Sequence, residues 1–322
     1  MSKSSQNGLI LSQNGVSKMS SWSIVTTVRA PEWQVNAFIK HYLEIGAKEI
    51  FLYFDDPAFS LELMNDRVKC IVCTEEDWGR KRPEGLEDRQ RFNATKAKDM
   101  TSAEWIMHCD IDELCWSAIP ISEVLSEQHE GIGGVMVSPR EAIYSKEPTN
   151  ESIYSTHFFK RFGDEAEPKK YKRIAEELFP TMAPAGKCGI WGHVQGKSFI
   201  KKEANSGRMP LHHKKNDIPG FEMRSRTDKI ILRHYDTMSY SLWRDKHMRR
   251  IFNEVLVPNA GKFRQKQQEY IMSAFNEKGD DGIRSVYTEM SVLAPDLLVK
   301  GIESGFICVI PPESHLNIIN GA

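Results

Sequence analysis

The first third of the chain alternates between short apolar runs and longer amphipathic stretches. Runs rich in β-branched and aromatic residues predict strands, and apolar residues spaced three and four apart predict helices. We expect strands at 22–28, 49–54, 68–72 and 104–109, and helices at 33–45, 59–65 and 86–100. Strands that alternate with helices and are apolar on both faces form a parallel sheet covered on both sides. The pattern therefore predicts a doubly wound, mostly parallel, Rossmann-like α/β fold.

The rest of the chain gives a weaker pattern. We expect a helix at 121–128, a strand at 135–137, a pair of strands flanking Gly196 and a strand at 230–235. The polar, proline-containing stretch 146–187 predicts long loops or short hairpins, and residues 240–300 read as helical. The predicted organisation is a flexible tail over 1–20, rich in Ser, Asn, Gln and Gly, an α/β domain over 21–240, and a helical extension over 241–322 packed on that domain.

Composition narrows the class of protein. With 40% hydrophobic and 27% charged residues, the chain has the profile of an ordinary soluble enzyme. Its 43 basic and 44 acidic residues leave a net charge of -1, so no long-range field would attract nucleic acid. No window approaches the roughly 18 to 20 apolar residues that cross a bilayer, and six scattered cysteines suit a reducing compartment. We therefore expect a cytoplasmic protein with no nucleic-acid partner.

The strongest local signal for chemistry is the acidic cluster Asp110-Ile111-Asp112-Glu113, directly after the strand expected at 104–109. At an extended strand end, Asp110 and Asp112 would share a face and could bind one divalent cation, Mn²⁺ or Mg²⁺. Such a cation neutralises a leaving diphosphate. Asp55 and Asp56 follow another strand, and ligands bind at this edge of open α/β sheets. From the spacing alone, a solvated turn or a helix cap explains the cluster equally well.

Four segments together resemble the family-2-like bacterial glycosyltransferases with a GT-A fold. They are Thr26–Arg29, Phe38–Ala47, Phe51–Asp56 and Trp105–Leu114, and both their order and their spacing match. The resemblance implies a UDP-sugar donor, with Thr27, Arg29 and either Asp55 or Asp56 near the nucleotide. It also implies that Asp110 and Asp112 hold the metal and the diphosphate. The family often has Asp-Asn-x-Ser where this chain has Asp55-Asp56-Pro57, which leaves the choice between the two aspartates open.

The resemblance resumes in the second half of the chain, at Gly196–Ile200, Leu211–His213, Leu232–Tyr235, Ser239 and Trp243–Lys246. It implies that His212 completes the metal sphere and that Lys197 and His234 lie near the donor. A surface histidine, a solvated lysine and a buried structural histidine are the plain alternatives. Gly196-Lys197-Ser198 does not complete a phosphate-binding P-loop, because position 191 is Trp where that motif needs Gly.

An inverting transfer, which the family implies, needs a carboxylate base to deprotonate the acceptor hydroxyl. The sequence does not identify it. Glu141 is our first candidate, ahead of Asp112, Glu113 and Asp217, and each is also explained as surface charge. A retaining enzyme would not need such a base.

The segment 243–250 contains Arg244, Lys246, His247, Arg249 and Arg250, with Trp243 and Met248 between them. This basic segment could bind an anionic lipid, an acidic glycan or a protein partner. Binding to anionic lipid would allow peripheral contact at the inner membrane face. A solvated helix face explains it as well.

These observations favour a metal-dependent glycosyltransferase that moves a sugar from a UDP-sugar to a hydroxyl of a surface polysaccharide or lipid-linked glycan. A nucleotidyltransferase also uses carboxylates and a metal, but it would need a glycine-rich basic loop after the first strand. Arg29-Ala30-Pro31-Glu32 is not such a loop. A third hypothesis is a non-catalytic glycan-binding or scaffold protein with the same fold.

Overall fold

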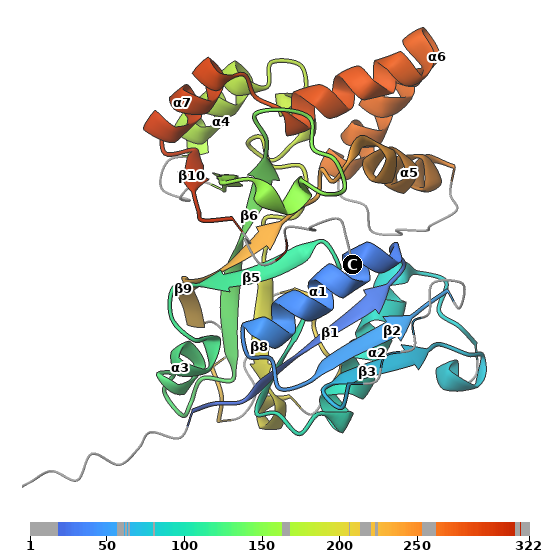
Figure 1. Ribbon diagram of the computed structural model, residues 1–322, viewed down its shortest axis with the longest axis vertical. Helices are drawn as coiled ribbons and strands as arrows, with labels where there is room; N and C mark the ends of the chain where they lie inside the picture. The colour runs from blue at the N-terminus through green and yellow to red at the C-terminus, as the bar shows by residue number, and fades with distance from the viewer. Residues whose placement is uncertain are drawn as a thin grey trace, which may run out of the picture.

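The computed structural model describes residues 19–56, 61, 63, 65–79, 81–162, 168–205, 207–212, 220–222, 225–252, 262–312 and 316 (Figure 1). The strands are β1 (Trp22–Val28), β2 (Ile50–Phe54), β3 (Val68–Val72), β4 (Trp105–His108), β5 (Glu113–Ser117), β6 (Gly134–Ile143), β7 (Phe158–Arg161), β8 (Lys197–Lys201), β9 (Ser225–His234) and β10 (Ile307–Val309). The α-helices are α1 (Glu32–Glu44), α2 (Leu86–Met100), α3 (Ile121–Ser126), α4 (Pro168–Leu178), α5 (Tyr240–Ile251), α6 (Lys262–Ser291) and α7 (Pro295–Glu303).

Strands β3, β2, β1 and β4 lie side by side in that order, and all their pairings are parallel. Successive residues of β1 point to opposite faces of the sheet. Ile24 belongs to the core cluster that contains Phe38 of α1, and Val25 belongs to the one that contains Ala94 of α2. The two helices therefore cover opposite faces, as in a doubly wound fold.

The ends of these strands form one edge of the sheet. Val28, the last residue of β1, pairs with Phe54, the last residue of β2. His108, the last residue of β4, pairs with Val25 of β1. The residues that follow β1, β2 and β4 are consequently neighbours, although they are far apart in the sequence.

The second half of the sheet is built differently. Antiparallel pairings join β4 to β8, β8 to β6, β6 to β7 and β7 to β10. Strand β9 pairs antiparallel with β5 and parallel with β6. In Figure 1, β6 and β9 run from the part that contains α1 and α2 toward the part that contains α4, α5, α6 and α7. The edge of the parallel strands thus faces the C-terminal helices.

The predicted α/β fold with a helical C-terminal extension is confirmed by this topology. Helices α5, α6 and α7 form the extension, with a break in α6 at Gly279, where φ is 58°. Strand β10 then returns to the sheet beside β7, so the extension also contributes a strand. The domain boundaries at 20 and 240 stay predictions.

Several local predictions were incomplete or wrong. The stretch 146–187, expected to be loops or short hairpins, contains β7 and the eleven-residue α4. Tyr171, Ile174, Ala175 and Leu178 of α4 are buried at helical spacing, so a helical pattern was present among the charged residues. Directly after Gly196 comes one strand, β8, whereas the only β pairing in the described residues 168–195 is an isolated bridge between Lys187 and Ile190. Most of the helix expected at 59–65 lies outside the described residues.

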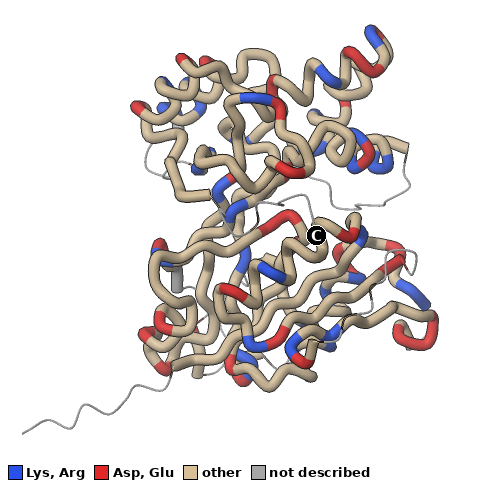
Figure 2. The backbone as a smooth tube through the Cα atoms, in the orientation of Figure 1, with Lys and Arg blue, Asp and Glu red and all other residues tan. Residues whose placement is uncertain are grey.

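The charges are mixed along the chain. In Figure 2, Lys and Arg alternate with Asp and Glu in both halves of the described trace. Within the described residues, no helix is long and apolar enough to cross a bilayer.

Candidate functional site

Helix α2 holds polar side chains at the carboxyl ends of β1, β2 and β4. Asn93 donates to Thr27 Oγ1 (3.0 Å), Arg89 to Asp55 Oδ2 (2.8 Å) and Gln90 to Asp110 Oδ1 (2.9 Å). The three donors lie within about one helical turn, so a single face of α2 contacts all three strand ends. The structure therefore brings the predicted residues Thr27, Asp55 and Asp110 together.

Asp55 and Asp56 have different surroundings. Both oxygens of Asp55 accept from arginines, because Arg82 donates to Oδ1 at 2.8 Å while Arg89 contacts Oδ2. Asp56 lies 3.7 Å from Arg29, and the side chains of Asp56 and Arg29 are 35% and 45% exposed, against 10% for Asp55. Asp56 and Arg29 are therefore the more accessible pair at this edge.

The acidic cluster is a turn rather than the extended strand end that we predicted. Strand β4 ends at His108 and β5 begins at Glu113. Between them, the backbone N–H of Glu113 donates to the carbonyl of Asp110 at 3.0 Å, which closes the turn. Lys197 Nζ, which is fully buried, lies 2.7 Å from Asp110 Oδ2 and 3.4 Å from Glu113 Oε2. Burial alone would raise the pKa values of Asp110 and Glu113, but the positive charge of Lys197 lowers them by more. The pKa of Asp110 is well below its usual range, and that of Glu113 is lowered to about 2.

Asp112 pairs with a different lysine. Lys246 of α5 donates to Asp112 Oδ2 and to Asp236 Oδ1, each at 2.9 Å. Burial lowers the pKa of Lys246, yet the two carboxylates outweigh it and raise that pKa. Helix α5 is thereby tied to the acidic turn, and the two aspartates of the cluster have separate partners.

Three histidines gather beside the turn. His193 Nε2 lies 2.6 Å from Glu113 Oε1, and its ring centroid is 4.5 Å from that of His212 and 5.3 Å from that of His234. His212 Nδ1 is 3.0 Å from the carbonyl of Gly196, and burial lowers the pKa of His212 to about 4. His212 is therefore neutral near pH 7. If Nδ1 donates to that carbonyl, Nε2 carries the lone pair that a metal ligand needs.

The donors at this site fit a divalent cation. Among the described residues, two groups have three ligand atoms within 4.8 Å of one another: Glu113, His193 and His234, and Asp112, His234 and Asp236. Neither group contains Asp110 or His212, which we predicted as ligands beside Asp112. The buried His193 Nδ1, His234 Nδ1 and Asp236 Oδ2 have no hydrogen-bond partner among the described residues. Buried polar atoms of this kind call for a ligand or water.

Glu141, our first candidate for the catalytic base, lies in the middle of a buried network. Its carboxylate is 2.5 Å from Lys160 Nζ, and it accepts from the backbone N–H groups of Trp191 and Gly192 at 2.7 to 3.1 Å. A Cβ on Gly192 would come within 2.4 Å of the His234 ring. Glu141 therefore anchors the loop that leads into His193 and packs against His234. Asp217 lies outside the described residues.

Sequence reasoning missed His193 and Asp236 altogether, and it gave Lys246 no role at the acidic cluster. The only local signal for His193 is its place three residues before Gly196-Lys197. The basic segment 243–250 is also not a uniformly solvated face, because His247 is fully buried and Lys246 points at Asp112 and Asp236.

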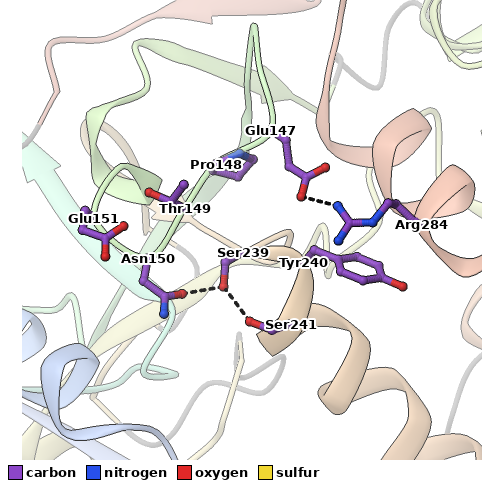
Figure 3. Close-up of a pocket in the computed structure, with 9 residues that line it drawn as sticks. All are labelled: Glu147, Pro148, Thr149, Asn150, Glu151, Ser239, Tyr240, Ser241 and Arg284. Carbon is purple, nitrogen blue, oxygen red and sulfur yellow. Dashed lines mark hydrogen bonds and ion pairs between the residues drawn. The ribbon is translucent and has the colours of Figure 1, made fainter. Parts of the chain in front are cut away.

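A surface pocket of about 320 Å³ opens where α5 begins (Figure 3). Its lining residues are Glu147, Pro148, Thr149, Asn150, Glu151, Ser239, Tyr240, Ser241 and Arg284. Ser239 donates to Asn150 at 2.5 Å, and Arg284 pairs with Glu147 at 2.6 Å while lying over the Tyr240 ring. Most of the lining is polar, and Ser239 lies three residues after Asp236, just before the start of α5.

Acid is expected to weaken folding through Glu113. Its folded pKa of about 2 lies below the ordinary 4.5, so its pairing with Lys197 stabilises the fold above pH 4.5 and is lost as pH falls toward 2. Urea unfolding at several pH values should therefore show the stability difference between the parent and Glu113→Gln shrinking over that window. A difference that stays constant with pH would mean that the pKa of Glu113 is not depressed.

No protein-family model and no curated protein matches the chain. Among solved structures, it is similar to glucosyl-3-phosphoglycerate synthase from Mycobacterium tuberculosis, solved with Mn²⁺, UDP and glucosyl-3-phosphoglycerate, with 14% identity over 57% of this chain and 58% of that chain and a TM-score of 0.29. HddC from Yersinia pseudotuberculosis matches with 8% identity over 70% of this chain and 97% of that chain, at a TM-score of 0.33. The mannosyltransferase Ktr4p from S. cerevisiae matches with 10% identity over 48% of this chain and 47% of that chain, at a TM-score of 0.25. The chain thus spans less than two thirds of the synthase, and at these TM-scores its function has to be argued from its own residues.

Proposed function

We propose that this protein is a metal-dependent glycosyltransferase that uses a nucleotide-sugar donor, with a UDP-sugar as our first candidate. One observation carries the proposal: carboxylates, a buried lysine and three imidazoles converge where the parallel strands β1, β2 and β4 end. This edge is where open α/β sheets bind nucleotides. A diphosphate leaving group needs this combination of cation ligands and fixed positive charge.

The donor's nucleotide would lie over the ends of β1 and β2. Arg29 and Asp56 are the accessible side chains there, whereas Asp55 is already paired with Arg82 and Arg89. We propose that Asp56 and Arg29 contact the nucleotide and that Asp55, with Thr27, fixes the wall behind it. Lys197 would face the diphosphate from the β8 side, because its ammonium already lies against Asp110.

Asp112, His234 and Asp236 would hold the cation, and Glu113 and His193, which converge on the same His234, would lie beside it. Mixed imidazole and carboxylate donors suit Mn²⁺ better than Mg²⁺, which prefers oxygen ligands. When bound, the cation supplies positive charge that stabilises the departing diphosphate. Direct ligation by Asp110 and His212 stays a prediction, since Asp110 contacts Lys197 and His212 packs on His193.

For the acceptor we propose a hydroxyl of a surface polysaccharide or lipid-linked glycan, with inversion at the sugar. The polar pocket at the start of α5 (Figure 3) suits a hydroxyl-rich molecule. Glu141 is enclosed by Lys160 and two backbone N–H groups, so we propose that it positions His193 and His234.

The test combines binding with turnover. We expect UDP with Mn²⁺ to raise the melting temperature and a chelator to remove that shift. A screen of nucleotide sugars should then find metal-dependent release of UDP from at least one donor. If no nucleotide binds with any divalent cation, the glycosyltransferase proposal is wrong. Binding without turnover of any donor would favour the scaffold hypothesis, and release of pyrophosphate from a nucleoside triphosphate and a sugar phosphate would favour the nucleotidyltransferase.

A further inference from the structure

Two arginines lie on the α5–α6 side of the site. Arg250 is in the last turn of α5, and Arg264 is in the first turn of α6. Among the described residues, neither forms an ion pair, and the enclosed Nη1 of Arg250 has no hydrogen-bond partner. Burial, followed by the charge of Arg264, lowers the pKa of Arg250 to about 10. Helix α5 packs on α6, so the two guanidinium groups lie on the same side of the site, and their charges oppose each other.

The nearest carboxylates are already used. Asp236 and Asp112 both act electrostatically on Arg250, but their hydrogen bonds go to Lys246, one turn earlier on α5. Asp110 and Glu113 are matched in the same way by Lys197. With a divalent cation bound to the carboxylates, this region would carry excess positive charge, which favours an anion.

Neighbouring residues hold Arg264 in place. Arg264 donates to Gln267 Oε1 at 3.0 Å, and the buried Gln267 donates to the carbonyl of Trp191 at 2.9 Å. Trp191 lies two residues before His193, so Arg264 is tied to the loop that bears this imidazole. His247 is fully buried beside Trp243, and the field of Arg250 and Arg264 acts on it. Arg264 is therefore fixed beside the loop that bears His193, and Arg250 lies one turn after Lys246 on α5.

Two like charges on partly enclosed side chains repel each other unless an anion joins them. Guanidinium groups match phosphate oxygens well, because their N–H donors form a planar fork. We propose that Arg250 and Arg264 form a phosphoryl-binding subsite on the α5–α6 side of the carboxylates. The bound group is either the diphosphate of the donor or a phosphate on the acceptor. The inference rests on the proposed function for the identity of the substrate, but the subsite itself is defined by the two arginines.

The test is calorimetric titration of Arg250→Gln and Arg264→Gln in the presence of Mn²⁺, with UDP, UMP and inorganic phosphate as probes. Arg249→Gln is the matched control, because Arg249 directly precedes Arg250 on α5 and its Nε donates to a backbone carbonyl of its own helix. If the donor diphosphate binds here, each variant should lose about 10-fold or more in UDP affinity and little in UMP affinity. If an acceptor phosphate binds here, UDP affinity should stay and phosphate binding to the UDP-loaded protein should be lost.

Unchanged affinities for both UDP and phosphate in both variants would overturn the subsite. If the parent binds phosphate in an Arg250-dependent way but does not bind UDP, the subsite stands and the proposed glycosyltransferase function fails. Melting temperatures without ligand separate binding from folding. Should Arg250→Gln not fold, Arg250→Lys keeps the charge but loses the fork, and its UDP or phosphate affinity should still fall measurably below that of Arg249→Gln.

Discussion

Asp112→Asn is expected to reduce metal-dependent turnover of the donor by at least about 100-fold. Asp112 is 6% exposed and lies 2.9 Å from Lys246 and 3.9 Å from His234. Asparagine has nearly the same shape, so the fold should be kept while one negative charge of the cation site is removed. Release of UDP from a nucleotide sugar, measured over a range of Mn²⁺ concentrations, gives the turnover. Mn²⁺ affinity measured by electron paramagnetic resonance should fall in parallel.

Two further variants sharpen this experiment. Asp228→Asn is the matched control, because Asp228 is exposed and lies on β9, the strand that also carries His234. It should behave like the parent. Asp110→Asn should weaken Mn²⁺ binding less than Asp112→Asn, since Asp110 is outside both groups of converging donors and contacts Lys197. If Asp112→Asn retains parental turnover and Mn²⁺ affinity, the proposed cation site is wrong.

The parallel part of the fold could be predicted because each of its elements has a complete local pattern. Trp22–Val28, Val68–Val72 and Leu86–Met100 have in the structure the bounds expected from the sequence. The polar residues at the strand ends were placed correctly as a consequence, since parallel strands end at a common edge. What could be predicted of the site was therefore the part contributed by β1, β2 and β4.

The imidazole side of the site could not be predicted in the same way. His234 lies beside the acidic turn because β9 pairs with β5 in a register that puts His234 opposite Glu113. Strand β5 is five residues long and follows the turn directly, so no spacing in the sequence indicates this pairing. His193 belongs to a loop whose position depends on hydrogen bonds to Glu141, fifty residues earlier in the chain. Non-local contacts of this kind leave no periodic signal.

The second large effect is expected on stability, when the buried ion pair of Glu141 and Lys160 is broken. Lys160 and Glu141 are 0% and 1% exposed, and the Lys160 ammonium also lies over the rings of Trp191 and Phe179. Burial lowers the pKa of Lys160 and Glu141 opposes that shift, so each charge depends on the other. Removing one partner of such a pair leaves an uncompensated buried charge. Lys160→Met and Glu141→Gln are each expected to lower the free energy of unfolding by about 3 to 5 kcal/mol.

The double variant distinguishes this positioning role from that of a base. Lys160→Met with Glu141→Gln removes both charges, while the glutamine carbonyl can still accept from the backbone N–H groups of Trp191 and Gly192. Urea unfolding should therefore show the double variant to be more stable than the sum of the single effects predicts, because the two residues are coupled. Donor turnover should return along with stability. A double variant that regains stability but shows no sugar transfer would identify Glu141 as the base, because only a reacting carboxylate would be missed in a correctly folded site.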